Sequence, residues 1–219
     1  MKKLIVAMGS LLILALSASM AGAALVPSVY DPGNTGCPVS TFSNGVLHLA
    51  KNCPTPTNAA AQASITGFTG ATFTSASFTL ASVSQCNGGS PRFNVYTNAM
   101  VQQPFFLGCN NVIPVVNATT GAATYTFTAA TIAAGGGQVP VPTGTISSVE
   151  IVLDVQGAAD LTNITFNGVV QVPDIQVGPP TSKSSCKNGG WKTFTSPKFK
   201  NQGQCVSYVA SHGRKQHNK

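Results

Sequence analysis

Ionisable side chains are scarce in this chain. Only 8% of its 219 residues are charged, five residues are acidic and three are histidines, whereas an ordinary soluble domain has about 25% charged residues. This composition excludes a coiled coil and a charge-driven disordered protein. Because general acid–base catalysis and metal binding use carboxylates and imidazoles, most enzyme mechanisms lack the side chains that they need. The sequence therefore predicts a non-enzymatic protein without a cofactor.

Several catalytic motifs are also missing. The chain has no Gly-x-Ser-x-Gly, no His-Glu-x-x-His and no Gly-x-x-x-x-Gly-Lys. These patterns supply the nucleophile of many hydrolases, the zinc ligands of metalloproteases and the phosphate cradle of nucleotide-binding proteins. No motif therefore supports any of these three functions.

The amino terminus has the pattern of an export signal. Lys2 and Lys3 precede an apolar stretch of 13 residues, 4–16, and Ala21-Gly22-Ala23 has the small-x-small spacing of a cleavage site. A helix that crosses a bilayer needs roughly 20 apolar residues, so this stretch is too short to be a membrane anchor. We predict a signal peptide over residues 1–23 that is cleaved after Ala23, and a secreted, extracellular protein without a transmembrane segment.

The rest of the chain has the periodicity of short strands. Gly occurs 22 times and Pro 14 times, which favours many turns over long helices. The clearest alternations of polar and apolar residues lie at 124–129 and 149–155, although Val152 interrupts the polar row of the second. Further strands are expected at 46–49, 63–68, 78–84, 92–97, 105–107, 112–116 and 164–172. We predict an all-β fold, a two-sheet antiparallel β-sandwich over residues 24–172.

If the protein is exported, its six cysteines are expected to form disulfides, because disulfides persist in an oxidising compartment. Six cysteines allow about 15 pairings, and sequence alone does not choose among them. Pairing in chain order closes loops of about 15 to 25 residues, each worth roughly 3 kcal/mol in the chain-entropy model. No Cys-x-x-Cys occurs, which argues against a zinc site. We predict the pairs Cys37 with Cys53, Cys86 with Cys109, and Cys186 with Cys205.

A small unit is expected at the carboxyl end. The Pro- and Ser-containing segment 173–185 is typical of a linker. Beyond it, Cys205, Tyr208, Val209 and His212 have the spacing of one helix face. A unit of about 34 residues buries little surface, so we predict that residues 186–219 form a disulfide-closed unit with a short helix.

Basic charge is concentrated in this C-terminal unit. Two basic and five acidic residues occur between positions 24 and 182, whereas eight basic residues and no acidic residue follow from position 183. Such a surface attracts polyanions through counterion release, and interleaved aromatic rings can stack on them. In a secreted protein the partner would be an anionic envelope polymer, an acidic polysaccharide or extracellular DNA. Alternatively, the aromatic residues form the core of the unit. The candidate polyanion-binding residues are Lys187, Lys192, Lys198, Lys200, Arg214 and Lys215.

Part of the chain resembles a known group of proteins. Residues 186–191, Cys-Lys-Asn-Gly-Gly-Trp, and 199–209, Phe-Lys-Asn-Gln-Gly-Gln-Cys-Val-Ser-Tyr-Val, carry a specific pattern. It resembles the C-terminal segment of uncharacterised exported bacterial proteins of the actinobacterial and Chloroflexi type. Residues 86–93 and 154–168 are similar to motifs of the sandwich domains that precede that segment, although the second motif more usually reads Asp-Asn-Ile there. The resemblance implies a secreted β-sandwich with a tail module, and no activity.

Two small sites are suggested by the few charged residues. Asp154, Asp160 and Asn163 are candidate Ca²⁺ ligands on a loop between two strands. Calcium takes about six to eight oxygen ligands, so the alternative is that these are turn residues whose side chains bond the local backbone. Arg92 is one of two cations in the predicted sandwich and is expected to pair with Asp154 or Glu150.

Two functions remain open from the sequence. The first is a surface or matrix protein whose basic C-terminal unit contacts an anionic polymer. The second is a carbohydrate-binding module in which aromatic rings on the sandwich, such as Tyr96, Phe105 or Tyr125, stack on sugar. Aromatic residues make up only 7% of the chain, which argues against a large sugar platform.

Overall fold

The computed structural model describes residues 24–99, 103–136, 139–173, 180, 182–187, 190–192, 194 and 197–212. The predicted signal peptide, most of the predicted linker, and the candidate residues Arg214 and Lys215 lie outside the described residues. Within the described part, no helix has the length and apolar character that a membrane crossing requires.

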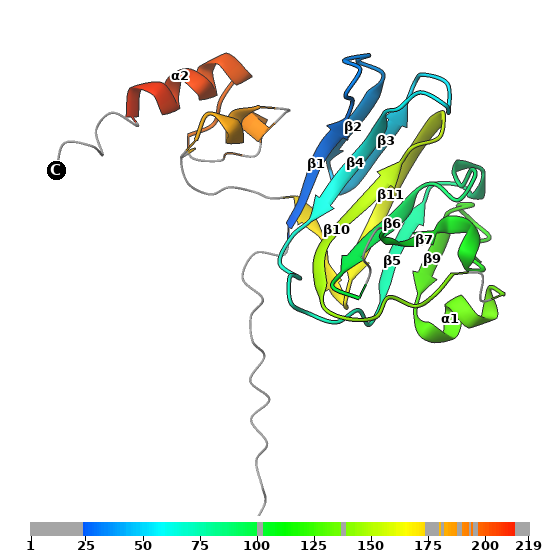
Figure 1. Cartoon of the computed structure of the whole chain (residues 1–219). Coiled ribbons are helices and arrows are strands. Elements are labelled where there is room, and N and C mark those ends of the chain that lie inside the picture. The colour runs from blue at the N-terminus through cyan, green and yellow to red at the C-terminus, as the bar shows by residue number, and fades with distance from the viewer. Residues whose placement is uncertain are drawn as a thin grey trace, which may run out of the picture.

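Two β-sheets pack face to face (Figure 1). Sheet A has six strands in the order β13-β1-β4-β10-β6-β7, and its neighbours are antiparallel except for the short β1–β13 pair. The strands of sheet A are β1 (Ala24–Tyr30), β4 (Ala60–Ile65), β6 (Arg92–Thr97), β7 (Phe105–Gly108), β10 (Ile146–Leu153) and β13 (Val172–Pro173).

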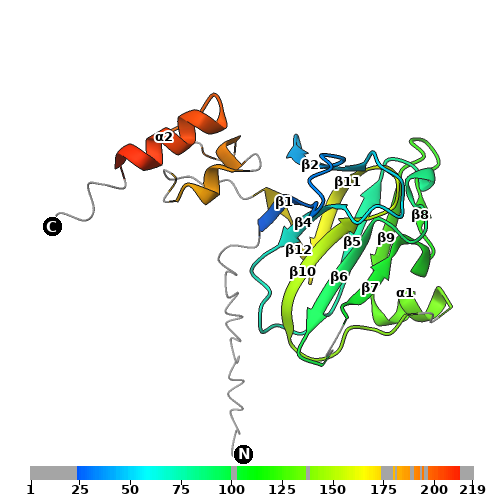
Figure 2. The ribbon, with the colours of Figure 1, turned by 45° about the horizontal axis from the view of Figure 1, so that its top comes forward.

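Sheet B has seven strands, all paired antiparallel, in the order β2-β3-β11-β5-β9-β8, with β12 paired to β11. Its strands are β2 (Pro38–Ser43), β3 (Val46–Lys51), β5 (Ala76–Leu80), β8 (Val115–Val116), β9 (Ala123–Phe127), β11 (Gly157–Phe166) and β12 (Val169–Val170). The short helix α1 (Ala129–Ala134) follows β9 at one end of the sandwich (Figure 2). Two 3₁₀ turns, η1 (Val83–Gln85) and η2 (Cys109–Asn111), lie in the loops.

The core lies between the sheets and is rich in aromatic rings. Phe78 of sheet B packs against Phe93 of sheet A with a centroid distance of 5.5 Å, and Phe93 contacts Phe127 and Phe166 at 5.8 and 6.0 Å. All four side chains are fully buried. Buried residues of the longer strands, such as β4 and β9, alternate with more exposed ones, because side chains alternate along a strand, and the outward residues form the two outer faces of the sandwich.

The predicted fold class, a two-sheet antiparallel β-sandwich, is confirmed. Strands β6 and β9 match the predicted segments closely, whereas the segment predicted as one strand over 164–172 contains the β11–β12 hairpin. Its turn is formed by Asn167 and Gly168, both with positive φ. Strands β1 and β2 and the helix α1 were not predicted.

Three disulfides connect the cysteines in chain order. Cys37 bonds Cys53, and Cys86 bonds Cys109, within the sandwich. Cys186 bonds Cys205 in the C-terminal unit. The structure therefore has the predicted pairing, and three disulfides indicate an oxidising, extracellular environment.

The described part of the C-terminal unit has its own small core. Two 3₁₀ turns, η3 (Ser184–Cys186) and η4 (Gly190–Lys192), precede the helix α2 (Gln202–His212). The buried residues Phe194 and Val209 surround the disulfide, and Phe199 packs edge-on against Phe194 and Tyr208 at 5.9 and 5.5 Å. The aromatic residues therefore form the core of the unit, which was one of the two alternatives, and the predicted short helix is present.

Candidate functional site

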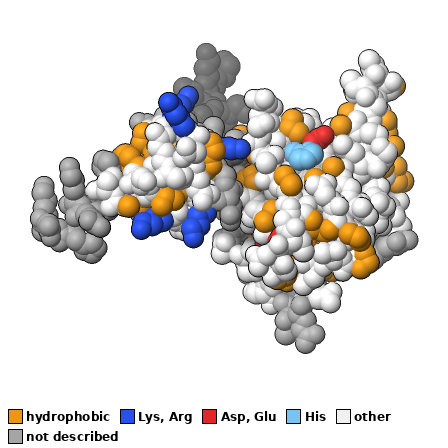
Figure 3. Space-filling view, turned by 90° about the horizontal axis from the view of Figure 1, so that it is seen from above, with side chains coloured by type: hydrophobic (Ala, Val, Ile, Leu, Met, Phe, Trp, Pro, Cys, Tyr) orange, Lys and Arg blue, Asp and Glu red, His pale blue; other side chains and the backbone are white. Residues whose placement is uncertain are grey.

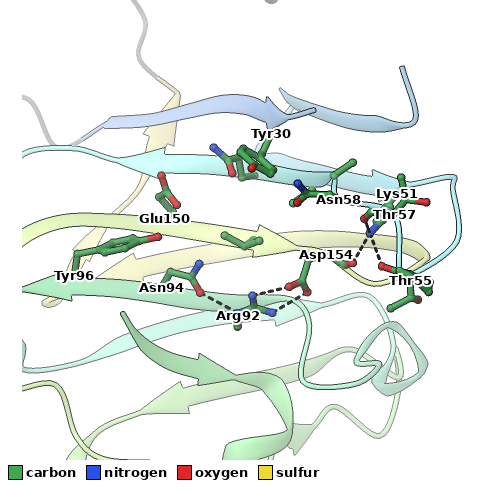
Figure 4. Close-up of a pocket in the computed structure, with 15 residues that line it drawn as sticks. Tyr30, Lys51, Thr55, Thr57, Asn58, Arg92, Asn94, Tyr96, Glu150 and Asp154 are labelled. Atoms are coloured by element: carbon green, nitrogen blue, oxygen red, sulfur yellow. Dashed lines mark hydrogen bonds and ion pairs between the residues drawn. The ribbon is translucent and has the colours of Figure 1, made fainter. Parts of the chain in front are cut away.

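A polar groove of about 550 Å³ crosses the outer face of sheet A. Strands β1, β4, β10 and β6 form its floor, and the loop 55–59 forms the wall at one end (Figure 4). Its side chains combine two tyrosines, three amides and four charged groups. The residues that line it are Tyr30, Lys51, Thr55, Pro56, Thr57, Asn58, Ala59, Ala60, Gln62, Arg92, Asn94, Tyr96, Glu150, Val152 and Asp154.

Strand register brings these side chains together. Val152 of β10 lies between Gln62 of β4 and Arg92 of β6, and the next outward residue of β10, Glu150, lies between Ser64 and Asn94. Outward residues on neighbouring strands are about 4.5 to 5.5 Å apart at Cβ. Val152 is only 5% exposed. The apolar residue that interrupts the polar row of β10 therefore forms part of the groove floor.

An ion pair between Arg92 and Asp154 fixes the middle of the groove. Arg92 donates two hydrogen bonds to the carboxylate, from Nη1 to Oδ1 at 2.7 Å and from Nη2 to Oδ2 at 2.6 Å. Ser90 Oγ donates a third at 2.7 Å. Burial favours a raised pKa for Asp154, but the hydrogen bonds from Arg92 and Ser90 and the charge of Arg92 outweigh it, and the pKa is lowered. Of the two partners predicted for Arg92, the structure selects Asp154.

Arg92 also orders its neighbours on the groove floor. Its Nε donates to Asn94 Oδ1 at 2.9 Å, and its guanidinium lies 4.9 Å from the ring centroid of Phe106. The planar guanidinium thus donates hydrogen bonds to Asn94, Asp154 and Ser90 and stacks on Phe106. These contacts hold Asn94 in one orientation before any ligand arrives.

The wall of the groove is organised by a buried ammonium group. Lys51 is only 1% exposed, and its Nζ donates to the carbonyl oxygens of Thr55, Thr57 and Asp154 at 2.9, 2.7 and 2.8 Å. All three donor positions of the ammonium are used. Lys51 is the last residue of strand β3 and lies close in sequence to the Cys37–Cys53 disulfide. The loop 55–59 is therefore attached both covalently and by hydrogen bonds.

Two tyrosines lie on the outer strands of the groove. Tyr30 of β1 is 49% exposed, and Tyr96 of β6 is half-buried. Burial, followed by the negative charge of Glu150, raises the pKa of Tyr96 above its ordinary value. Among the aromatic residues suggested from the sequence, only Tyr96 lies here. Phe105 and Tyr125 are 5% and 2% exposed and point into the core, so the prediction that their rings stack on a ligand was wrong.

Glu150 differs from the other charged residues of the groove. It is half-buried, and no side-chain hydrogen bond to its carboxylate is formed within the described residues. Burial raises its pKa. A carboxylate that lines the groove and has no described side-chain partner is free to accept hydrogen bonds from a ligand, so Glu150 is a candidate for ligand contact.

No protein-family model, no curated protein and no solved structure matches this chain. The resemblance of residues 186–209 to exported bacterial proteins therefore stays a prediction.

The candidate calcium ligands do not come together. Asp154 lies on the outer face of sheet A, and both of its carboxylate oxygens accept hydrogen bonds from Arg92. Asp160 lies inside β11 on the outer face of sheet B, where its Oδ1 is 2.7 Å from His48 Nδ1. Asn163 is at an irregularity of β11 with a φ of 49°. Asp160 and Asn163 lie in strand β11 and not in a loop, and the two aspartates lie on opposite faces of the sandwich, so these three residues do not form the predicted site.

The candidate polyanion-binding lysines that are described are all at the surface. Figure 3 shows Lys and Arg side chains (blue) on the C-terminal unit. Lys192 Nζ lies 5.6 Å from the ring centroid of Trp191, and no acidic residue occurs in this part of the chain. The exposed lysines are Lys183, Lys187, Lys192, Lys198 and Lys200.

Proposed function

We propose that this protein is a non-enzymatic, secreted glycan-binding module and that the groove on sheet A is its binding site. The observation that carries this proposal is the combination of two tyrosine rings with side chains that are already held in place. Asn94, Arg92 and Asp154 are ordered by their own hydrogen bonds. An ordered site loses little conformational entropy when a ligand binds.

The chemistry of the groove suits a sugar. Sugars carry many hydroxyl groups that donate and accept hydrogen bonds, and their C–H faces pack on aromatic rings. The groove offers amide groups at Asn58, Gln62 and Asn94 and ring surface at Tyr30 and Tyr96. A tyrosine combines an apolar ring with a polar hydroxyl, which suits a ligand of mixed character.

Hydrolysis of the glycan is not supported by the positions of the carboxylates. Glu150 lies in β10 and Asp154 directly follows its last residue, Leu153, so their Cα atoms are about 13 Å apart at 3.3 Å per residue. The two carboxyl groups of glycosidases are about 5 to 9.5 Å apart. Moreover, Asp154 is bonded to Arg92 and is not available as a nucleophile or a base. We therefore favour binding over catalysis.

The test is a glycan screen followed by titration calorimetry with the full secreted chain. Tyr96→Ala and Tyr30→Ala are each expected to weaken binding of the best glycan by about tenfold, because each removes one ring that packs on the sugar. Thr126→Ala, an exposed substitution on the outer face of sheet B, is the matched control and is expected to bind as the unsubstituted protein does. Equal binding by all three variants, or the lack of any glycan ligand, would contradict the proposal.

A second function is favoured by the C-terminal unit. Its described lysines are exposed and its aromatic residues are used in its core, so any attraction for an anionic polymer would be electrostatic. We expect the full chain to bind DNA or an acidic polysaccharide with an affinity that falls steeply as salt rises.

The four-fold variant Lys187→Gln, Lys192→Gln, Lys198→Gln and Lys200→Gln is expected to bind DNA more weakly at low salt. The slope of log affinity against log salt should fall by about one for each phosphate that a lysine no longer neutralises. The measurement is fluorescence anisotropy over a salt series. A flat salt response of the unsubstituted chain would contradict an electrostatic role for these lysines.

Export through cleavage after Ala23 is part of the same proposal. Strand β1 begins at Ala24, whose backbone oxygen accepts a 2.9 Å hydrogen bond from Thr66 N. Cleavage at the predicted site would therefore leave every described strand intact. The disulfides support an extracellular location, and mass spectrometry of the secreted protein would identify its first residue.

A further inference from the structure

The positive charges of the groove are already used within the protein. Lys51 Nζ bonds three carbonyl oxygens and is almost fully buried. Arg92 bonds both carboxylate oxygens of Asp154 and also Asn94. Asp154 in turn receives three side-chain hydrogen bonds. Arg92 and Asp154 thus neutralise each other, and the ammonium of Lys51 donates its hydrogen bonds to backbone carbonyl oxygens.

Glu150 is the charged residue of the groove whose side chain has no hydrogen-bond partner within the described residues. Its carboxylate faces the groove between Ser64 and Asn94, and no described side chain bonds it. Figure 4 shows Glu150 and Tyr96 at one end of the groove and Lys51 at the other. The end of the groove that contains the ring of Tyr96 therefore also contains a carboxylate that no described side chain bonds.

We propose that the groove selects glycans with protonated amino groups, of the glucosamine type, through Glu150. This inference rests on the proposed glycan-binding function. An ammonium group next to Glu150 would give that carboxylate the charge-assisted hydrogen bond that the free protein lacks. An acidic sugar would place a second negative charge beside it, so uronic acids and sulfated sugars are disfavoured in this groove. Anionic polymers would then bind to the C-terminal unit, and amino sugars would bind to the groove of the sandwich.

The experiment compares two oligosaccharides of equal length by titration calorimetry with the full chain. In buffer at which the amine is protonated, the glucosamine oligosaccharide is expected to bind about tenfold more tightly than the N-acetylglucosamine oligosaccharide. Glu150→Gln is expected to remove this preference, because its loss of affinity should be about tenfold larger for the glucosamine oligosaccharide than for the acetylated form. Asp160→Asn, on the opposite face, is expected to keep it.

Further variants separate this inference from the function on which it rests. Tyr96→Ala is expected to lower the affinity for both oligosaccharides equally, because the ring packs on the sugar whether or not the sugar is charged. If the protein binds neutral glycans without a preference for glucosamine, or if Glu150→Gln keeps the preference, the inference is wrong and the proposed function stands. If no glycan binds to the unsubstituted chain, both fail. Because glutamine removes an unpaired half-buried charge, the Glu150→Gln protein is expected to fold, which circular dichroism checks.

Discussion

The substitution Lys51→Met is expected to lower the free energy of unfolding by about 3 kcal/mol. Methionine keeps most of the aliphatic length of lysine but removes the ammonium, so three carbonyl oxygens lose their donor at once. Each hydrogen bond to a charged group is worth about 1.5 to 3 kcal/mol. The buried amine no longer has to be desolvated, which offsets part of the loss. Urea unfolding followed by far-UV circular dichroism measures the change.

The matched control for this prediction is Lys198→Met, which removes an exposed ammonium from the C-terminal unit. Its effect on unfolding is expected to be within about 0.5 kcal/mol. Since Thr55 and Thr57 line the groove, the Lys51 variant should also bind glycan more weakly than the control. A Lys51→Met protein as stable as the Lys198→Met protein would show that the loop holds its shape without the ammonium.

Much of the sandwich was predictable because its strands alternate in polarity. Strands β6 and β9 were both predicted within two residues of their ends, and β9 alternates strictly between buried and more exposed residues. Strand β1 was missed for a physical reason. It contains Pro27, and Val26 and Val29, which lie on opposite faces of the strand, are both apolar and exposed, so its sequence has no clear period of two.

The groove was only partly visible in the sequence. The Arg92 ion pair was predicted because two cations and five acidic residues leave few possible partners. Lys51 was missed because its acceptors are backbone carbonyls, one of them from Asp154 more than a hundred positions away, and backbone acceptors leave no sequence signal. A clue was present at Val152, where an apolar residue interrupts a polar row. An outward strand residue that is buried, as Val152 is, is covered by neighbouring side chains on the outer face of the sheet.

The aromatic residues were harder to assign from the sequence. Most of the phenylalanines and tyrosines within the strands fill the core, as Phe105 and Tyr125 do. Whether a ring on a strand points into the core or outward, as Tyr30 and Tyr96 do, depends only on its position in the alternation of side chains. A shift of one residue in register would turn the inward rings outward and the outward rings inward. The proposed sugar-stacking residues therefore became identifiable only with the register of sheet A.

The second large effect is expected from Asp154→Asn, which should lower the free energy of unfolding by about 2 kcal/mol near neutral pH. Asparagine has the shape of aspartate, but it has no charge and its amide nitrogen is a donor. Arg92 would lose one of its two bonds and its compensating charge while remaining largely buried. Because the ion pair is partly exposed, we expect less than the roughly 3 to 5 kcal/mol of a fully buried pair.

This loss is expected to depend on pH in a defined direction. The pKa of Asp154 is lowered in the folded protein, so the ion pair contributes stability above the unfolded-state pKa of about 3.9. That contribution is lost as the pH falls through the lower, folded-state pKa. Unfolding free energies of the unsubstituted protein and Asp154→Asn should therefore differ at neutral pH and converge in strong acid.

The control for this last prediction is Asp160→Asn, because Asp160 also pairs with a basic residue but does so at the surface. The side chains of His48 and Asp160 are 41% and 45% exposed, and exposed pairs contribute about 0 to 1 kcal/mol. If Asp160→Asn costs as much as Asp154→Asn, or if the difference between Asp154→Asn and the unsubstituted chain persists in strong acid, then loss of the Arg92 ion pair is not what destabilises the variant. The ordered floor that the glycan proposal requires would then have another source.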